Sequence, residues 1–188
     1  PLQLTVTEME LPLIRDEEVL IRVEAVGICG SELEGYLGHS SVRQPPLVMG
    51  HEFSGVVEKI GAGTTRASVG DRVVVNPLVA CRNCDKCRQG RTNVCRNRQI
   101  IGIHRPGAFA DYVAVPESNV YRVDSEADPV LLSLAEPLAV CIHGLKIGYR
   151  PFEALMIYGA GPIGLLTLQA ALQMGASKVL VVDKQRNR

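Results

Sequence analysis

Three residues in two short stretches offer the ligand types that zinc accepts in an open, catalytic site: a thiolate, an imidazole and a carboxylate. Cys29 lies in the stretch Gly27-Ile28-Cys29-Gly30-Ser31, and His51 and Glu52 directly follow Gly50. Both stretches carry glycines beside the candidate ligands, which let the backbone approach a metal or a substrate closely. Any one of these ligands alone is more often a core or surface residue. Together, and next to strand-like runs, they predict a metal site.

A second candidate metal site is a cluster of four cysteines, with the spacing Cys81-x2-Cys84-x2-Cys87-x7-Cys95. In a chain of 188 residues without a secretory signal, such crowding favours a metal over disulfides. The surrounding lobe, residues 81–98, has one acid (Asp85) and no aromatic residue. Its basic residues are Arg82, Lys86, Arg88, Arg91, Arg96 and Arg98. Four thiolates around Zn²⁺ leave a net charge of about minus two, which these cations and backbone N–H groups can offset.

Three other interpretations of this lobe stay open from the residues alone. Two local disulfides are disfavoured, because cysteines so close in a tight turn bridge poorly. An iron–sulfur cluster is disfavoured because the fourth cysteine of a bacterial ferredoxin run follows after three residues and precedes proline. Here it follows after seven residues and precedes Arg96. A nucleic-acid-binding zinc knuckle lacks an aromatic residue for base stacking. A structural zinc site is therefore the favoured prediction.

Composition limits the class of protein and its partners. The chain is 46% hydrophobic and 21% charged, which is typical of a globular protein. Its formal net charge is zero, so it offers no electrostatic support for a nucleic-acid or anionic-membrane partner. No apolar run approaches the roughly 18 residues of a membrane span, and no signal peptide opens the chain. Together with the cysteine spacing, which favours a metal over disulfides, the lack of a signal predicts a reducing, cytoplasmic compartment. Because the sequence opens on Pro1, further residues are expected in front of it.

Residues 1–150 are predicted to be mostly β and to form an irregular barrel or sandwich. Turn residues separate short alternating runs, as in Gly61-Ala62-Gly63 and Arg105-Pro106-Gly107. The predicted strands are Leu2–Thr7, Val19–Val26, Phe53–Ile60, Arg72–Val75, Phe109–Val115 and Val120–Val123.

Beyond residue 126 the pattern changes to helical turns interrupted by prolines, from Asp128 to Val140. Glu136 is an acid inside this otherwise apolar run. From the residues alone it is a helix-terminal carboxylate near solvent, and Cys141 and His143 are packing residues.

From Glu153 the sequence predicts the first unit of a dinucleotide-binding fold. An apolar strand, residues 154–158, runs directly into a G-x-G-x-x-G turn, followed by a helix and a second strand, residues 178–182. Asp183 ends that strand, nineteen residues beyond Gly164. The turn places a pyrophosphate at the helix N-terminus and the acid binds the adenosine ribose hydroxyls. The predicted cofactor-binding residues of the turn are Gly159, Gly161, Pro162, Ile163 and Gly164. The carboxylate would repel a 2′-phosphate, which favours NAD over NADP.

The last residue is Arg188, one strand–helix–strand unit into a fold that needs about six strands. Two strands alone would leave a sheet edge and one side of a helix uncovered. The expectation is therefore a fragment or part of a longer chain.

Taken together, these motifs resemble the zinc-dependent medium-chain alcohol dehydrogenases, in the branch of sorbitol, threonine and other polyol dehydrogenases. The resemblance covers essentially the whole chain, and besides the sites above it includes Gly70-Asp71-Arg72-Val73 and Glu136-Pro137-Leu138-Ala139. It implies an α/β fold in which a mostly-β GroES-like catalytic domain (residues 1–150) precedes the start of a Rossmann domain (residues 151–188). Relatives often carry Asp after the Cys-Gly-Ser/Thr, where this chain has Glu32 and, nearby, Glu34.

The resemblance also implies roles for individual residues. Cys29, His51 and Glu52 would bind a catalytic zinc, with Glu136 as a further acid that binds directly or through water. Cys81, Cys84, Cys87 and Cys95 would bind a structural zinc, which makes two zinc ions per chain. Asp183 and Arg188 match an Asp-x4-Arg pattern that contacts the adenosine ribose.

The predicted activity is NAD-dependent oxidation of a secondary alcohol, polyol-like or threonine-like, in a full-length homodimer or homotetramer. Zinc would act as a Lewis acid on the substrate oxygen, and the alkoxide would give hydride to nicotinamide. Ser31 is the candidate for passing the hydroxyl proton toward solvent, unless it only caps a helix. The alternative is a catalytically silent, zinc-stabilised module that binds a partner.

Overall fold

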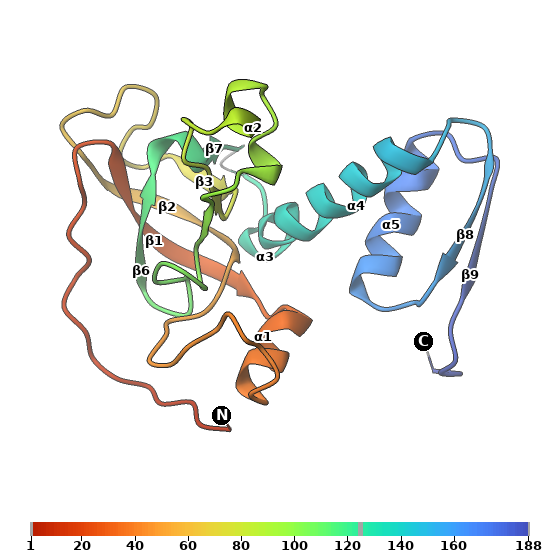
Figure 1. Ribbon diagram of the computed structural model, residues 1–188, viewed down its shortest axis with the longest axis horizontal. Helices are drawn as coiled ribbons and strands as arrows, with labels where there is room; N and C mark the ends of the chain where they lie inside the picture. The colour runs from red at the N-terminus through yellow and green to blue at the C-terminus, as the bar shows by residue number, and fades with distance from the viewer. Residues whose placement is uncertain (1, 124–125, 188) are drawn as a thin grey trace. The chain divides into compact units, whose positions relative to one another are not determined.

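The computed structural model describes residues 2–123 and 126–187, and the chain divides into two compact units, Pro1–Leu134 and Ala135–Arg188 (Figure 1). Each unit has its own hydrophobic core. The chain combines a mostly-β part with an α/β part, as the sequence predicts.

The first unit is built on a five-stranded antiparallel sheet with the strand order β6-β1-β2-β3-β7. All five strands lie within or close to runs that the sequence predicts as strands. They are β1 (Glu18–Gly27), β2 (Glu52–Ile60), β3 (Arg72–Val75), β6 (Tyr112–Pro116) and β7 (Val120–Arg122).

The core of this unit is formed by apolar side chains from β1, β2, β3 and β6, joined by Ile101 and Ala108. The alternation in β1 predicts a half-buried strand, but Val19, Leu20 and Ile21 are all at most 2% exposed. Two features explain the difference: β1 lies between β2 and β6, and helix α3 (Pro129–Ser133) packs against β1 and β2. The middle of the sheet is therefore covered on both faces.

The strand predicted at Leu2–Thr7 is wrong: residues 2–15 have no regular secondary structure. Leu4 and Val6 are fully or mostly exposed, and the Leu2 N–H donates to the carbonyl oxygen of Tyr36 at 2.7 Å. A strand is stabilised by its cross-strand neighbours rather than by its own alternation. The described residues offer this segment no such neighbour.

Several short elements, which the sequence analysis does not predict, place the site residues. Helix α1 (Gly30–Tyr36) directly follows β1. The two-residue strands β4 (Leu78–Val79) and β5 (Gln99–Ile100) pair with each other and so close the base of the cysteine lobe. Within the lobe lie helix α2 (Asp85–Arg88) and the 3₁₀ turn η1 (Thr92–Val94); a second turn, η2 (Glu117–Asn119), joins β6 to β7.

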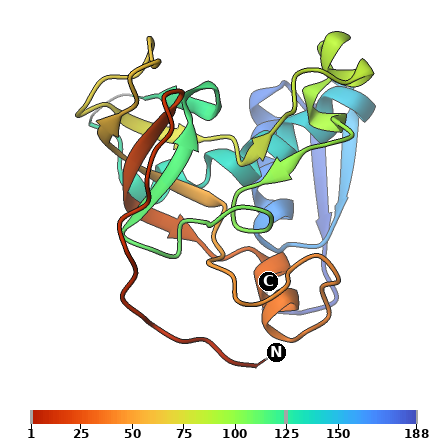
Figure 2. The ribbon, with the colours of Figure 1, turned by 60° about the vertical axis from the view of Figure 1, so that its left-hand side comes forward.

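The second unit contains helix α4 (Ala135–Gly148), strand β8 (Ala154–Tyr158), helix α5 (Pro162–Gln173) and strand β9 (Lys178–Val182). β8 and β9 pair in parallel from Ala154↔Lys178 to Tyr158↔Val182, and α5 packs against both (Figure 2). This is the strand–helix–strand unit that the glycine-rich turn predicts.

The two units divide between Leu134 and Ala135, whereas the sequence analysis places the boundary after residue 150. The difference lies in α4, which packs on α5 and contributes Leu145 to the second core. Pro137 is tolerated in this helix because it lies in the first turn, where its missing N–H would have no intrahelical partner. Within the described residues, no helix is both long and apolar enough to cross a membrane.

Candidate functional site

The structure brings Cys29, His51 and Glu52 together, with one ligand atom of each within 4.8 Å of the others. The pairing of β1 with β2 explains this arrangement. Gly27, the last residue of β1, lies opposite Glu52, the first residue of β2. Cys29 follows the end of one strand and His51 precedes the start of the other, so antiparallel pairing places all three ligands at the same end of the sheet.

Two of the nearby glycines lie in close contact with neighbouring groups. A Cβ atom on Gly27 would lie 2.7 Å from the Glu52 carboxylate oxygen Oε2. Gly50 has a φ of +95°, and a Cβ atom there would lie 2.7 Å from the backbone nitrogen of Phe109. By contrast, Gly30 has open space around it. The expectation that glycines let the backbone come close therefore holds at Gly27 and Gly50 but not at Gly30.

The buried carboxylate of Glu32 orients the His51 ring. Its Oε1 atom lies 2.9 Å from His51 Nδ1 and accepts the Gly50 N–H at 2.9 Å, while Oε2 accepts the Cys29 N–H at 2.8 Å. Burial alone would raise the pKa of Glu32, but these hydrogen bonds hold the pKa below its usual value. An ionised Glu32 makes Nδ1 the protonated ring nitrogen, so the lone pair of Nε2 can bind a metal.

Sequence reasoning names Glu32 only as a departure from relatives and gives it no role. The sequence did contain a signal for this role. An acid three residues after the N-cap residue of a helix commonly accepts the backbone N–H of that N-cap residue. Cys29 is the N-cap of α1 and Glu32 is its third helical residue.

Ser31 lies beside the thiol of Cys29. Burial raises the pKa of Cys29, and the Glu52 carboxylate raises it further, whereas hydrogen bonds from the Ser31 hydroxyl and backbone N–H act in the opposite direction. Ser31 Oγ also accepts a hydrogen bond from Arg43 Nη2 at 2.9 Å. Ser31 lies inside α1 rather than at its N-cap, so helix capping does not explain it.

The chemistry of this donor set fits zinc. One sulfur, one imidazole nitrogen and one carboxylate oxygen converge, and His51 and Glu52 are each only 9% exposed. Three protein ligands leave a fourth position for water or a substrate oxygen, which is the arrangement of catalytic zinc sites.

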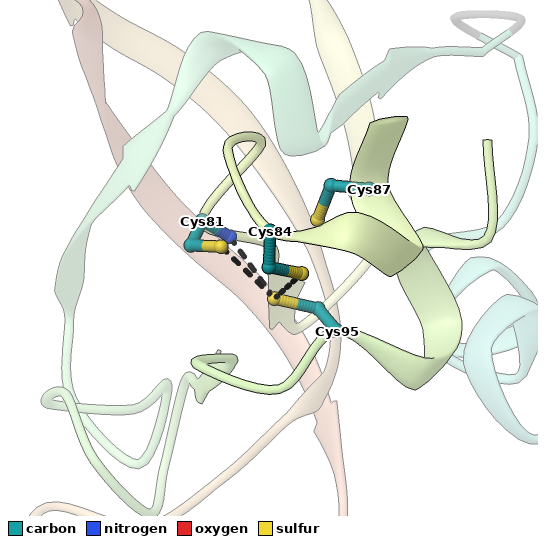
Figure 3. Close-up of side chains that lie close together, drawn as sticks. All are labelled: Cys81, Cys84, Cys87 and Cys95. Atoms are coloured by element: carbon teal, nitrogen blue, oxygen red, sulfur yellow. Dashed lines mark hydrogen bonds between the residues drawn. The ribbon is translucent and has the colours of Figure 1, made fainter. Parts of the chain in front are cut away.

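The four cysteines of the lobe also converge, with their sulfur atoms pointing toward one another (Figure 3). Cys95 Sγ lies 3.4 Å from Cys81 Sγ and 3.9 Å from Cys84 Sγ. A tetrahedron with zinc–sulfur bonds of about 2.3 Å has sulfur atoms about 3.8 Å apart. All six cysteines of the chain are free thiols, so the alternative of local disulfides is wrong for this structure. Four convergent thiols fit a closed zinc site.

Backbone N–H groups are the main source of thiolate stabilisation in this lobe. The N–H groups of Arg96 and Cys87 lower the pKa of Cys84 to about 6, and the N–H of Asn83 lowers the pKa of Cys81. Burial and the neighbouring thiols raise the pKa of Cys87 to about 12.

Three arginines of the lobe bind other groups within it. Arg88 and Arg98 donate to the carbonyl oxygens of Asn83 and Cys95, and Arg96 binds both carboxylate oxygens of Asp85 at 2.8 and 3.1 Å. They hold the lobe in shape around the thiols.

In the second unit the glycine-rich turn opens the N-terminus of α5. Gly161 is the N-cap and Pro162 the first helical residue, followed by Ile163. A Cβ atom on Gly164 would lie 1.9 Å from the carbonyl oxygen of Gly159, so only glycine fits there. These features fit a pyrophosphate at the helix N-terminus.

Asp183 lines an open hollow of about 530 Å³ in this unit. Its Oδ2 accepts the Ala160 N–H at 2.7 Å, and its Oδ1 accepts the Gln185 N–H at 2.7 Å. The carboxylate therefore ties the glycine-rich turn to the end of β9. The other residues around the hollow are Ala160, Leu165, Leu168, Val181, Val182, Gln185 and Arg186.

The other residues that the sequence analysis singles out are Glu136, Arg188, Cys141 and His143. Glu136 lies in the first turn of α4, in the second unit, and its role in binding zinc remains a prediction. Arg188 lies outside the described residues. Cys141 is buried and its thiol donates to the carbonyl oxygen of Ile163, as a packing residue would, whereas His143 is exposed.

The fold and the two ligand sets define a class of protein, the zinc-binding dehydrogenases with a GroES-like N-terminal domain. The alcohol dehydrogenase GroES-like domain matches residues 15–125, and the chain belongs to this family.

Similar proteins agree with this assignment. L-threonine 3-dehydrogenase of Bacillus subtilis is 38% identical over 97% of this chain and 53% of its own length. A zinc-binding dehydrogenase from Sinorhizobium meliloti 1021 bound to NADP superposes with a TM-score of 0.90 at 38% identity, over 95% of this chain and 52% of that one. A short chain alcohol dehydrogenase from Escherichia coli CFT073 complexed with NADH gives a TM-score of 0.87 at 31% identity, over 99% and 60%. The chain thus spans about half the length of the relatives it matches.

Proposed function

We propose that the full-length protein oxidises a secondary alcohol, polyol-like or threonine-like, with NAD as the hydride acceptor. One observation carries this proposal: Glu32 holds Nδ1 of His51, and the ligand atoms of Cys29, His51 and Glu52 converge within 4.8 Å of one another. A structural zinc alone would not need this second, open ligand set. The chemistry of the similar proteins supports an oxidoreductase.

Zinc bound by Cys29, His51 and Glu52 supplies Lewis acidity that lowers the pKa of an alcohol. The chain's own residues orient and stabilise this centre. Glu32 fixes the tautomer of His51 and accepts two backbone N–H groups that flank the ligands. Ser31 provides a hydroxyl beside Cys29 and is the proposed relay that passes the proton of the substrate hydroxyl on toward solvent. Glu136 is proposed as a further acid at this centre.

The proposed cofactor is NAD, and the hollow beside Asp183 is its proposed adenosine site. The carboxylate can accept hydrogen bonds from both ribose hydroxyls, whereas a 2′-phosphate would bring about minus two charges next to it. The similar structures include one with NADP and one with NADH, so the family accommodates both. Arg186, which lines the hollow, is a cation that could attract a phosphate.

Asp183→Ser in the full-length protein should raise the Michaelis constant for NAD and improve the use of NADP. Loss of a charge-assisted hydrogen-bonding group should weaken NAD binding by about 1.5–3 kcal/mol. Asp183→Asn is the matched variant, because it keeps an oxygen for the Ala160 N–H but removes the charge. Steady-state kinetics with both cofactors measures the effect. If the parent already prefers NADP, or if neither variant changes the preference between NAD and NADP, the role proposed for Asp183 is wrong.

The proposed activity is tested by steady-state NAD reduction on a panel of polyols, L-threonine and simple secondary alcohols. We expect turnover with at least one of them and loss of that turnover on addition of a zinc chelator. No turnover on any alcohol, from protein that retains zinc at Cys29, His51 and Glu52, would favour the alternative of a silent zinc-stabilised binding module.

A further inference from the structure

Arg43 is a buried cation without a carboxylate partner. The residue is 8% exposed, its Nε atom is buried and has no hydrogen-bond partner, and no acidic side chain among the described residues forms an ion pair with it. A buried charge is costly unless another charge balances it. An arginine in this position therefore needs an explanation beyond packing.

Packing and a backbone hydrogen bond fix the position of the Arg43 side chain. The stem of Arg43 crosses helix α1 at Gly35, where a Cβ atom would lie 2.5 Å from Arg43 Cδ. The backbone N–H of Arg43 also donates to Ser40 Oγ at 3.3 Å. The missing side chain at position 35 thus makes room for the arginine.

Among the described residues, the side-chain hydrogen bond of Arg43 leads to the metal ligands. Its Nη2 donates to Ser31 Oγ at 2.9 Å, and Ser31 lies two positions after Cys29. A hydroxyl oxygen that accepts from a guanidinium directs its own hydrogen elsewhere. The Cys29 sulfur, which hydrogen-bonds with the Ser31 hydroxyl, is the acceptor within reach.

The charges around the candidate zinc explain why a cation is placed there. Cys29 and Glu52 are anionic ligands, and Glu32 is a third anion, held by the Gly50 and Cys29 N–H groups and by His51. Within the first unit, three anions exceed the charge of a divalent ion by one. Arg43 supplies one positive charge, which neutralises these three anions and the ion.

We propose that Arg43 is the counter-charge of the zinc centre at Cys29, His51 and Glu52, and that it acts through Ser31. It offsets the excess negative charge of the ligand set and holds the Ser31 hydroxyl toward the Cys29 sulfur. Arg43 is thus a positioning residue. Its positive charge lowers the affinity of the site for zinc, and it also neutralises the negative charge of the zinc-bound centre. This inference rests on the proposed zinc site but not on the proposed reaction.

The test compares Arg43→Gln, which removes the charge but keeps an N–H donor, with Arg43→Lys, which keeps the charge. Zinc affinity of the open site is measured in the full-length protein by competition with a chelator, after removal of the more labile zinc ion. Arg43→Gln should bind zinc about 10-fold more tightly or better, because a positive charge near a divalent ion has been removed. Arg43→Lys should stay within about three-fold of the parent, because its charge is unchanged.

Other outcomes overturn the proposal. If both variants bind zinc like the parent, Arg43 acts only as a hydrogen-bond donor; if both bind it more weakly, Arg43 is a packing residue. Arg43→Met provides a second neutral variant should Arg43→Gln fail to fold. Arg122→Gln is the control for net charge, since the Arg122 side chain is 74% exposed and lies on β7.

A second measurement separates this inference from the proposed function. With an alcohol that the parent oxidises, Arg43→Gln should lower kcat more than it changes KM. Loss of the positive charge leaves the centre more negative, which opposes a developing alkoxide but not the neutral alcohol. If the parent oxidises no alcohol, the proposed function fails while the zinc affinities still decide the role of Arg43.

Discussion

His51→Ala is expected to abolish alcohol oxidation and to reduce the zinc content by one ion per chain. Loss of the imidazole removes a zinc ligand and leaves Glu32 without its partner at Nδ1. Lewis-acid stabilisation is worth several kcal/mol, which at about 1.4 kcal/mol per tenfold corresponds to a loss in kcat of roughly 10³-fold or more. The fold should survive, because the apolar core of β1, β2, β3 and β6 does not include His51.

His39→Ala is the matched control for this substitution. His39 lies 3.0 Å from Glu34 and its side chain is 64% exposed, so it resembles the His51–Glu32 pair without being buried. We expect this variant to keep its zinc and its turnover. If His51→Ala retained activity, or if it lost activity only through unfolding seen by circular dichroism, Cys29, His51 and Glu52 would not be the catalytic centre.

Cys95→Ser is expected to unfold the lobe of residues 81–98 while the antiparallel sheet keeps its structure. Cys95 is fully buried, and its sulfur lies 3.4 Å from that of Cys81 and 3.9 Å from that of Cys84. Structural zinc supplies folding free energy directly, so a lost ligand should destabilise the lobe by several kcal/mol. Limited trypsin digestion measures this, because six basic residues lie in the lobe and unfolding frees the backbone beside them for cleavage.

Cys141→Ser is the matched control, since Cys141 is also a buried thiol but lies on α4 and hydrogen-bonds to Ile163. It should leave the digestion of the lobe unchanged. A Cys95→Ser protein whose lobe resists trypsin as well as the parent does would show that zinc does not hold this lobe together.

The sites that local spacing encodes could be predicted from the sequence. The four cysteines lie within fifteen positions, and the glycine-rich turn is fixed by contacts such as Gly164 with Gly159. In both cases neighbours in the chain are neighbours in space. The strands β2 and β3 were also predicted correctly, because each shows its own run of strand-forming residues, and their bounds agree closely with the predicted runs.

Features that depend on distant partners could not be predicted in this way. Glu32 acts on His51 nineteen positions away, and Arg43 reaches Ser31 twelve positions away, so neither pairing leaves a local pattern. The segment Leu2–Thr7 shows the opposite case, because it alternates like a strand but has no neighbour to pair with among the described residues. Helix α4 joins the second unit through its packing on α5, which its own sequence does not reveal.

Zinc content per chain, determined by metal analysis of the parent, His51→Ala and Cys95→Ser proteins, tests the central claim most directly. The claim is that this chain carries two separate zinc sites, one open and one closed. We expect about two zinc ions in the parent and about one in each variant, since each site has its own ligand set. We also expect a chelator to remove the ion at Cys29, His51 and Glu52 first, because an open site exchanges more readily. Iron in place of zinc, a single ion in the parent, or a variant that keeps both ions would contradict the account.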